Sequence, residues 1–269
     1  MKRLSILPLV QFCVLSLSFA AINLLGLPKA TAATFELTFT RLEGIINKNI
    51  RNGAGTAIYR ASLPTGYDIT AIQISDIIGI GGSPGRFTGL DLDAVKISDK
   101  LITNAEDIKN LTGLSVFDFN SEHTKFVAGT QRDPGNSKFR DLFKGDHLFG
   151  TKKCGDNQYC VDNDIATLGN FDANAITDNT ARGFMSFGDG GQLILNLTQT
   201  VSTYEQQPLY FYAAEVGDNE RLRGRVTATG RKRRVPEPSG LGALSLLGLY
   251  LTTGIKKKRK SFSSRVDKL

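Results

Sequence analysis

The middle of the chain lacks any long stretch of helical period, and this limits its possible folds more than any other feature. Thr34 to Thr40 alternates strictly, with Phe35, Leu37 and Phe39 on one face. Strands are predicted over 34–40, 69–80, 90–97, 114–119, 184–187, 193–197, 209–216 and 221–229. Only 105–111 and 133–143 look helical, and both are short. Short strands joined by glycine-rich turns are typical of all-β folds, so we expect a single β-sandwich or jelly-roll domain over 33–230.

The N-terminus has the pattern of a secretory signal peptide. Lys2 and Arg3 form a charged start, and the apolar run from Leu4 to Leu27 follows. Ala30 and Ala32 supply the small residues that signal peptidase requires, with cleavage expected after Ala32. We therefore expect residues 1–32 to be removed during export.

The C-terminus, residues 231–269, combines a basic linker, a rigid motif, an apolar run and a basic end. The motif consists of Val235, Pro236, Glu237 and Pro238, and its prolines keep the linker extended. Leu241 to Ile255 would span about 22 Å as a helix, which is short for a bilayer core of about 30 Å. The basic stop consists of Lys256, Lys257, Lys258, Arg259 and Lys260. Such a cluster favours the cytoplasmic side, so this pattern predicts a transmembrane anchor with the body of the protein outside the cytoplasm.

The motif, apolar run and basic stop together resemble the PEP-CTERM sorting signal of Gram-negative bacteria and cyanobacteria. The resemblance implies recognition by an exosortase, a membrane-embedded cysteine transpeptidase that removes the anchor and passes the protein towards the surface. Members of this family are often linked to exopolysaccharide and biofilm matrix. Two features depart from the pattern: the cations at 231–234 lie on the outer side, and Ser261 to Leu269 follow the basic stop. The alternative is an ordinary C-terminal membrane anchor.

A second resemblance concerns the body of the protein. Gly183 to Leu197, followed by Leu209 to Glu220, is similar to the domain that precedes the anchor in many cyanobacterial PEP-CTERM proteins. This resemblance implies no activity.

The charge of the chain lies mainly in its targeting segments. Of 33 basic and 26 acidic residues, three basic ones fall in 1–32, and eleven basic and two acidic ones in 231–269. Residues 33–230 keep 19 basic and 24 acidic residues, a net charge of −5. An acidic body does not carry the basic surface that nucleic-acid binding requires, so we expect no nucleic-acid partner.

Two cysteines remain after removal of the signal peptide, Cys154 and Cys160. They are close in sequence, and an exported protein meets an oxidising environment, so we expect them to form a disulfide. Their spacing differs from C-x-x-C, which excludes a thioredoxin-like redox site and a zinc knuckle.

The segment Gly81 to Gly85 formally matches the G-x-S-x-G nucleophile elbow, with Ser83 as nucleophile. That elbow needs a helix after the serine, whereas a proline follows here and a strand is predicted next. His123 and His147 are the only candidate bases in the chain. We therefore interpret this segment as a turn and expect no enzyme activity.

Asp91 and Asp93 lie two residues apart in a predicted strand and could share one face as calcium ligands. A second oxygen-rich cluster comprises Asp156, Asn157, Asp162, Asn163 and Asp164. Neither follows the EF-hand spacing. Solvated turn residues are the simpler interpretation, and a structural calcium is the alternative; no other cofactor is expected.

Two features bear on polysaccharide binding. Arg221, Arg223 and Arg225 alternate on one predicted strand, where they could bind acidic polysaccharide or protect a sheet edge. The chain has no tryptophan, and Tyr210 and Tyr212 alternate as packing residues do, which weighs against a lectin.

These patterns predict an exported, non-enzymatic surface or extracellular-matrix protein. We expect it to be an inner-membrane-anchored precursor that then reaches the cell surface or the medium. Signal peptidase and exosortase are its expected partners, and exopolysaccharide a further one. The alternative is a carbohydrate- or calcium-binding surface module.

Overall fold

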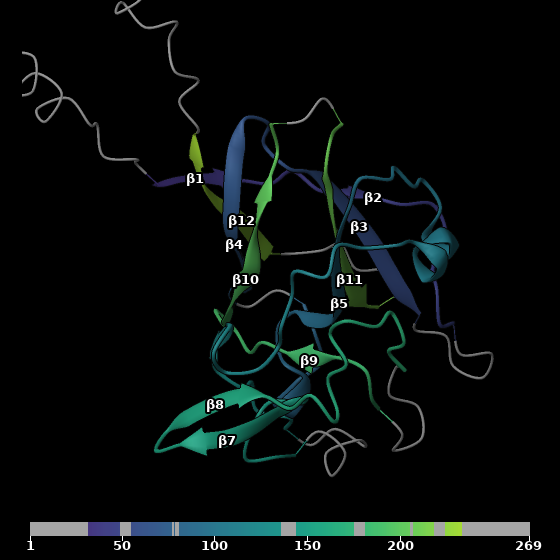
Figure 1. Ribbon diagram of the computed structural model, residues 1–269. Helices are drawn as coiled ribbons and strands as arrows, with labels where there is room; N and C mark the ends of the chain where they lie inside the picture. Colours follow the sequence, from purple (N-terminus) through teal and green to yellow (C-terminus); the bar gives the residue numbers. More distant parts are fainter. Residues whose placement is uncertain are drawn as a thin grey trace, which may run out of the picture. The chain divides into compact units, whose positions relative to one another are not determined.

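The computed structural model describes residues 32–48, 55–76, 78, 81–135, 144–174, 181–204, 207–217 and 224–232, all within the unit Met1–Lys232. These residues form antiparallel strands with two short 3₁₀ helices, and they include no α-helix (Figure 1). The predicted all-β class is therefore confirmed.

The elements follow one another along the chain with these bounds. The strands are β1 (Ala32–Glu36), β2 (Thr40–Arg41), β3 (Thr56–Ser62), β4 (Tyr67–Asp76), β5 (Asp91–Ser98), β6 (Thr124–Val127), β7 (Thr151–Gly155), β8 (Gln158–Val161), β9 (Met185–Ser186), β10 (Gln192–Ser202), β11 (Tyr210–Val216) and β12 (Gly224–Lys232). The 3₁₀ helices are η1 (Gly85–Phe87) and η2 (Ala105–Asn110). One five-stranded sheet has the order β1-β12-β4-β10-β6, and a second has the order β2-β3-β11-β5-β9. β7 and β8 form a separate hairpin.

The predicted strand at 34–40 is divided between the two sheets. Phe35, Leu37 and Phe39 are less exposed than the residues between them, as the alternation predicts. β1 pairs with β12 in the first sheet, whereas β2 pairs with β3 in the second. The segment therefore crosses from one sheet to the other while it keeps its apolar side inward.

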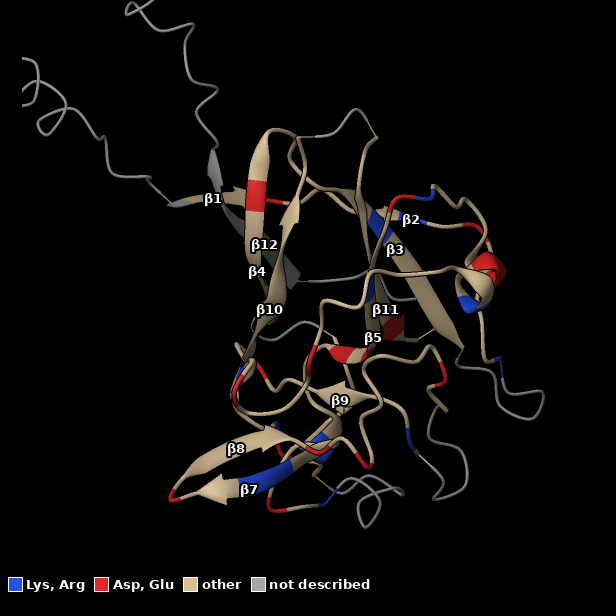
Figure 2. Ribbon diagram, in the orientation of Figure 1, with Lys and Arg blue, Asp and Glu red and all other residues tan. Residues whose placement is uncertain are grey.

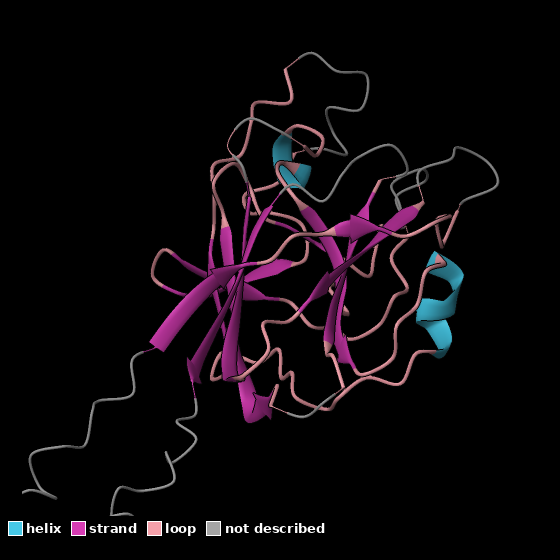
Figure 3. Ribbon diagram, turned by 90° about the horizontal axis from the view of Figure 1, so that it is seen from above, coloured by secondary structure: helices cyan, strands magenta, loops and turns pink. Residues whose placement is uncertain are grey.

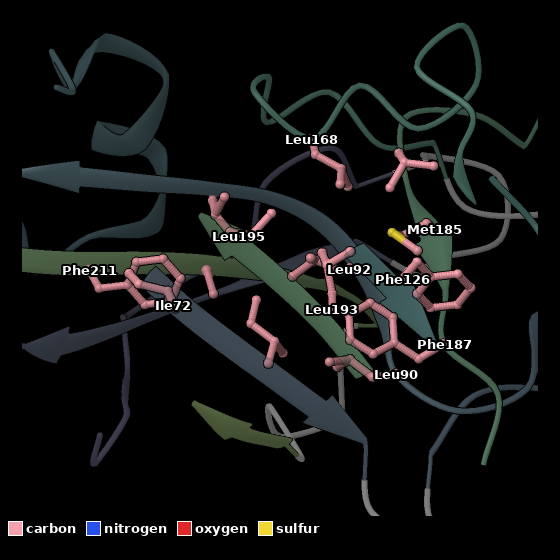
Figure 4. Packing of buried hydrophobic residues seen from close by; sticks show 14 of the residues in the cluster. Ile72, Leu90, Leu92, Phe126, Leu168, Met185, Phe187, Leu193, Leu195 and Phe211 are labelled. Carbon is pink, nitrogen blue, oxygen red and sulfur yellow. The ribbon is translucent and has the colours of Figure 1, made fainter. Parts of the chain in front are cut away.

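A single hydrophobic cluster contains residues from both sheets. Ile72 of β4 and Leu193 and Leu195 of β10 come from the first sheet, and Leu92 and Phe211 come from the second (Figure 4). All five are at most 1% exposed. Burial of aliphatic and aromatic side chains is the main favourable contribution to folding, so this shared cluster holds the two sheets together.

The second sheet is covered on its other side as well. There, η2 packs Ala105 and Ile108 against Ile58 of β3 and Tyr212 of β11 (Figure 3). Tyr212 is fully buried; its hydroxyl donates to the Lys100 carbonyl at 2.7 Å and accepts from the Ile102 amide at 3.1 Å. Strands buried on both faces show continuous apolar runs rather than alternation. This explains why β3 escaped the sequence prediction.

Several strand predictions need correction. Residues 114–119 form no strand: the segment is extended but joins its neighbours only through single bonds, such as Leu114 N–H to the Ile97 carbonyl. β4 spans Tyr67–Asp76; beyond it residue 78 is a turn, and residues 77, 79 and 80 of the predicted strand lie outside the described residues. The Asp76 carboxylate accepts from the Leu90 and Gly190 amides. β6, β7 and β8 were not predicted.

The predicted helix at 105–111 is the 3₁₀ helix η2. Of the predicted helix at 133–143, residues 133–135 are loop and turn, and 136–143 lie outside the described residues.

Candidate functional site

A surface hollow lies along the segment 113–119, beside β5 and β10. It consists of three adjoining depressions of about 540, 190 and 410 Å³. Ser115 lines all three depressions, and Phe117 lines the first two. We call this hollow the Phe117 groove. It combines aromatic and polar side chains, a composition that is usual for ligand sites.

Two parallel phenylalanine rings occupy the first two depressions. Phe117 and Phe119 stack with their ring centroids 6.1 Å apart and their planes inclined by 11°. Both rings are partly exposed, and Phe117 also rests on the buried ring of Phe211 at 6.5 Å. Gly169 lies beside Phe119, where an added Cβ would come within 3.4 Å of the ring carbon Cε2. The glycine therefore leaves the edge of this ring uncovered.

Uncharged polar groups surround the rings. Ser115, Asn170 and Thr198 are exposed at the groove, and their side chains make no hydrogen bond with another described residue. Asn163 reaches across the groove and donates to the Phe119 carbonyl at 3.2 Å. These hydroxyl and amide groups can donate to and accept from a ligand.

The groove contains little positive charge. Asp118 accepts from the amide and the side chain of Asn120, at 3.0 and 2.8 Å. Lys96 borders the second depression, but its ammonium donates to the Leu111 carbonyl at 2.9 Å and lies 5.1 Å from the centre of the Phe171 ring. Burial lowers the pKa of this lysine. The described lining therefore offers no accessible cation to an anionic ligand.

Asp91 and Asp93 are not the solvated residues that the simpler interpretation expected. They are 7% and 0% exposed, respectively, within β5. Asp91 accepts from the Ser186 hydroxyl, whereas Asp93 Oδ1 accepts from the Ala173 amide at 3.2 Å. No group of three potential metal-ligating side chains occurs among the described residues. A calcium ion at this pair stays a prediction.

The second carboxylate oxygen of Asp93 is a buried acceptor without a hydrogen-bond partner in the described part of the chain. Burial raises the pKa of Asp93 well above its usual value. The amide of Ala173 opposes this shift, and the negative charge of Asp172 adds to it.

Cys154 and Cys160 form the predicted disulfide, which closes the β7–β8 hairpin with its Cα atoms 5.9 Å apart. The hairpin extends away from the sheets, and β7 carries exposed basic residues (Figures 1 and 2). The second oxygen-rich cluster lies at and after this hairpin. Asn157 takes the turn with φ of 55°, and Asp162 accepts from Lys152 Nζ and from the Asp164 amide, both at 3.3 Å. These oxygens are engaged in local structure.

The segment at Ser83 is a tight turn. Gly82 pairs with Thr88 as an isolated bridge, and the 3₁₀ helix η1 spans only Gly85–Phe87. A Cβ on Gly82 would come within 2.2 Å of the Gly89 carbonyl oxygen, so this close approach requires glycine. The geometry differs from the strand-turn-helix of a nucleophile elbow.

Several predicted features lie outside the described residues. These are the signal peptide up to residue 31, the sorting motif Val235 to Pro238, the apolar run, the basic stop Lys256 to Lys260, and Arg221 and Arg223. The backbone of Arg225 lies in β12 opposite Ser75. Among the described residues, no helix combines the length and hydrophobicity that a membrane crossing needs.

Sequence reasoning missed the Phe117 groove. The sequence predicts a strand over 114–119, and the absence of tryptophan with the packing pattern of Tyr210 and Tyr212 weighs against a sugar-binding surface. The usable signal was an aromatic pair two residues apart that flanks an aspartate. Residues 163–170 also line the groove, and they reach it through tertiary contacts with residues distant in the sequence. The local sequence pattern carries no information about such contacts.

No protein-family model matches the chain, and searches of curated proteins and of solved structures returned no match.

Proposed function

We propose that this protein is an exported, membrane-anchored surface or extracellular-matrix protein without enzyme activity, sorted by an exosortase-type transpeptidase. The observation that carries the proposal is the order of the C-terminal features: the motif Val235 to Pro238, the apolar run Leu241 to Ile255, and the basic stop Lys256 to Lys260. A signal-peptide pattern at the other end supports the same destination.

The disulfide is a second, independent observation in support of export. Cys154 and Cys160 close a hairpin on the outside of the protein, where reducing cytoplasm would reach the bond. Disulfides persist in oxidising compartments and are rare in the cytosol. An exported body with a small stapled hairpin agrees with the proposed location.

The body is proposed to be a β-sandwich of the jelly-roll kind. The shared hydrophobic cluster and the crossing of residues 37–39 between the sheets both favour this architecture. Exported domains of this type present loops and sheet edges for binding, and the proposed matrix role needs no catalytic group.

Intact mass and cell fractionation in the source organism test the proposal, with and without the sorting enzyme. We expect the enzyme to remove the tail beyond the motif, and its deletion to leave an anchored chain in the inner membrane. Glu237→Ala should reproduce the deletion, whereas Glu220→Ala, the same substitution outside the motif, should be processed normally. A soluble cytoplasmic chain with both ends intact would refute the proposal.

A further inference from the structure

We infer that the Phe117 groove binds a neutral oligosaccharide chain. This inference goes beyond the proposed function, which concerns the destination of the protein and assigns it no ligand. It rests on three properties of the groove: a pair of parallel rings, uncharged polar groups around them, and an elongated shape.

The rings provide the surface on which a sugar would stack. The apolar faces of pyranose rings pack against aromatic side chains, and flat aromatic groups supply large contact area at low conformational cost. Phe117 and Phe119 are nearly parallel, at 11°, and 6.1 Å apart, so they can contact successive sugar rings of one chain. The Phe117 ring packs against the buried ring of Phe211. Because residue 169 is a glycine, no side chain at that position covers the Phe119 ring. The platform is thus pre-organised before any ligand binds.

The polar groups match sugar hydroxyls. Ser115, Asn170 and Thr198 present exposed hydroxyl and amide groups that have no hydrogen bond to another described residue. Such groups both donate and accept, as do the hydroxyls of a saccharide. A purely apolar ligand would leave the polar groups in the groove without hydrogen-bond partners, which is unfavourable.

The charge favours a neutral ligand over an acidic one. Asp118 lines the first depression and Asp99 the third, whereas the cation of Lys96 is directed to Leu111 and Phe171. Carboxylates repel uronic acids and sulfated sugars, and no accessible cation among the described lining residues offsets this repulsion.

The shape favours a chain over a single sugar. Leu114 and Ser115 are common to the second and third depressions, and Phe117, Phe119 and Gly169 to the first and second. The three depressions therefore neighbour one another along residues 113–119, a row that has room for several sugar rings.

Isothermal titration calorimetry tests the inference with cellohexaose, maltohexaose and laminarihexaose as neutral probes and hexagalacturonate as the acidic probe. The full chain is used, purified in a detergent without a sugar headgroup. We expect a Kd of about 1 mM or tighter for at least one neutral hexasaccharide, and binding of hexagalacturonate at least about tenfold weaker. Failure of all three neutral probes, or preference for the acidic one, overturns the inference.

Variants locate the binding. Phe119→Ala removes one of the two rings, and Gly169→Leu covers it with a side chain. Each variant should bind the preferred hexasaccharide about tenfold more weakly, or weaker still. Asn170→Ala changes an exposed amide outside the core and should weaken it a few-fold without altering the fold. Tyr159→Ala is the matched control, because it removes a partly exposed ring of β8 outside the groove.

Circular dichroism of each variant checks that it is folded, and Asn170→Ala keeps the test decisive if a ring variant does not fold. Wild-type affinity in a folded Phe119→Ala or Gly169→Leu chain places the binding elsewhere and overturns the inference. Because localisation plays no part in this measurement, its failure leaves the proposed function standing.

Discussion

The two sheets and the long connection between β5 and β10 differ in how their residues are held. In the sheets, side chains such as Ile72 and Phe211 are buried in one shared cluster. The connection, from Asp99 to Gly191, adds the short strands β6 and β9 to the sheets. Much of its remaining described backbone is loop, held by hydrogen bonds, η2 and a disulfide. The Phe117 groove lies where these regions meet.

Stability comes from the buried cluster, to which the connection also contributes Phe126, Leu168 and Phe187. The groove, by contrast, is lined mainly by less buried loop residues of the connection. Core side chains contribute through the removal of apolar surface from water, which depends on close packing. Loops that leave such a framework can carry rings and amides on the surface without affecting the core. Phe117 connects the two roles, since one side of its ring packs against the core and the other borders the groove.

The largest effect is expected from Phe211→Ala, which tests whether the shared cluster carries the stability. The ring is fully buried and lies within 6.2 Å of the Phe39 ring, centre to centre. Removal of a buried phenylalanine costs about 3–5 kcal/mol of the free energy of unfolding. Urea unfolding measures this loss by circular dichroism, because the chain has no tryptophan to report by fluorescence.

Leu101→Ala in the connection is the control for that experiment. Leu101 is 54% exposed, so its truncation should change the free energy of unfolding by no more than about 0.5 kcal/mol. Equal losses in the two variants would show that burial in the shared cluster does not determine the stability of the fold.

The sequence predicts the sheets better than the connection, for a physical reason. The alternation at Thr34 to Thr40 and the apolar strand at Asp91–Ser98 reflect burial that each residue experiences locally. β3 was missed because both of its faces are covered, which removes the alternation. The groove forms only where residues 115 and 170 lie close together in the fold, and a local sequence pattern does not predict such a tertiary contact. In the connection, the cysteine pair was predictable because its chemistry is specific, and the short elements η2 and β9 fall within predicted segments.

The second prediction concerns Asp93, a sheet residue whose burial works against stability. Its folded-state pKa is raised, so the native chain retains a proton that the unfolded chain loses above about pH 4. The free energy of unfolding should therefore fall as the pH rises from about 4 towards the folded-state pKa. Asp93→Asn should abolish this fall, because an amide does not titrate, and it should be more stable than wild type at pH 7, where wild type carries the cost of burying the carboxyl group.

Thermal melting between pH 4 and pH 8 checks this expectation. Asp107→Asn is the control, because Asp107 is exposed on η2 and the variant should keep the wild-type pH dependence. A calcium ion at Asp91 and Asp93 predicts the opposite for Asp93→Asn: a lower melting temperature at pH 7, and a wild-type chain that EGTA destabilises. The two outcomes separate a proton from a metal at this buried carboxyl.

The smallest effect is expected from replacing both Cys154 and Cys160 with serine. The bond closes a loop of only a few residues, for which the chain-entropy model gives about 2 kcal/mol. The hairpin extends from the sheets, and β7 is exposed from Lys152 to Gly155. We therefore expect the loss to be local: amide hydrogen exchange should accelerate about thirtyfold in β7 and β8 and remain unchanged in β4 and β10.

Lys153→Ala provides the control, since it changes an exposed residue of β7 and leaves the disulfide intact. Its exchange rates should match those of the wild type in every strand. Faster exchange in β4 and β10 of the serine variant would mean that the Cys154–Cys160 disulfide also stabilises the shared cluster. The hairpin would then contribute to global stability as the buried residues of the connection do.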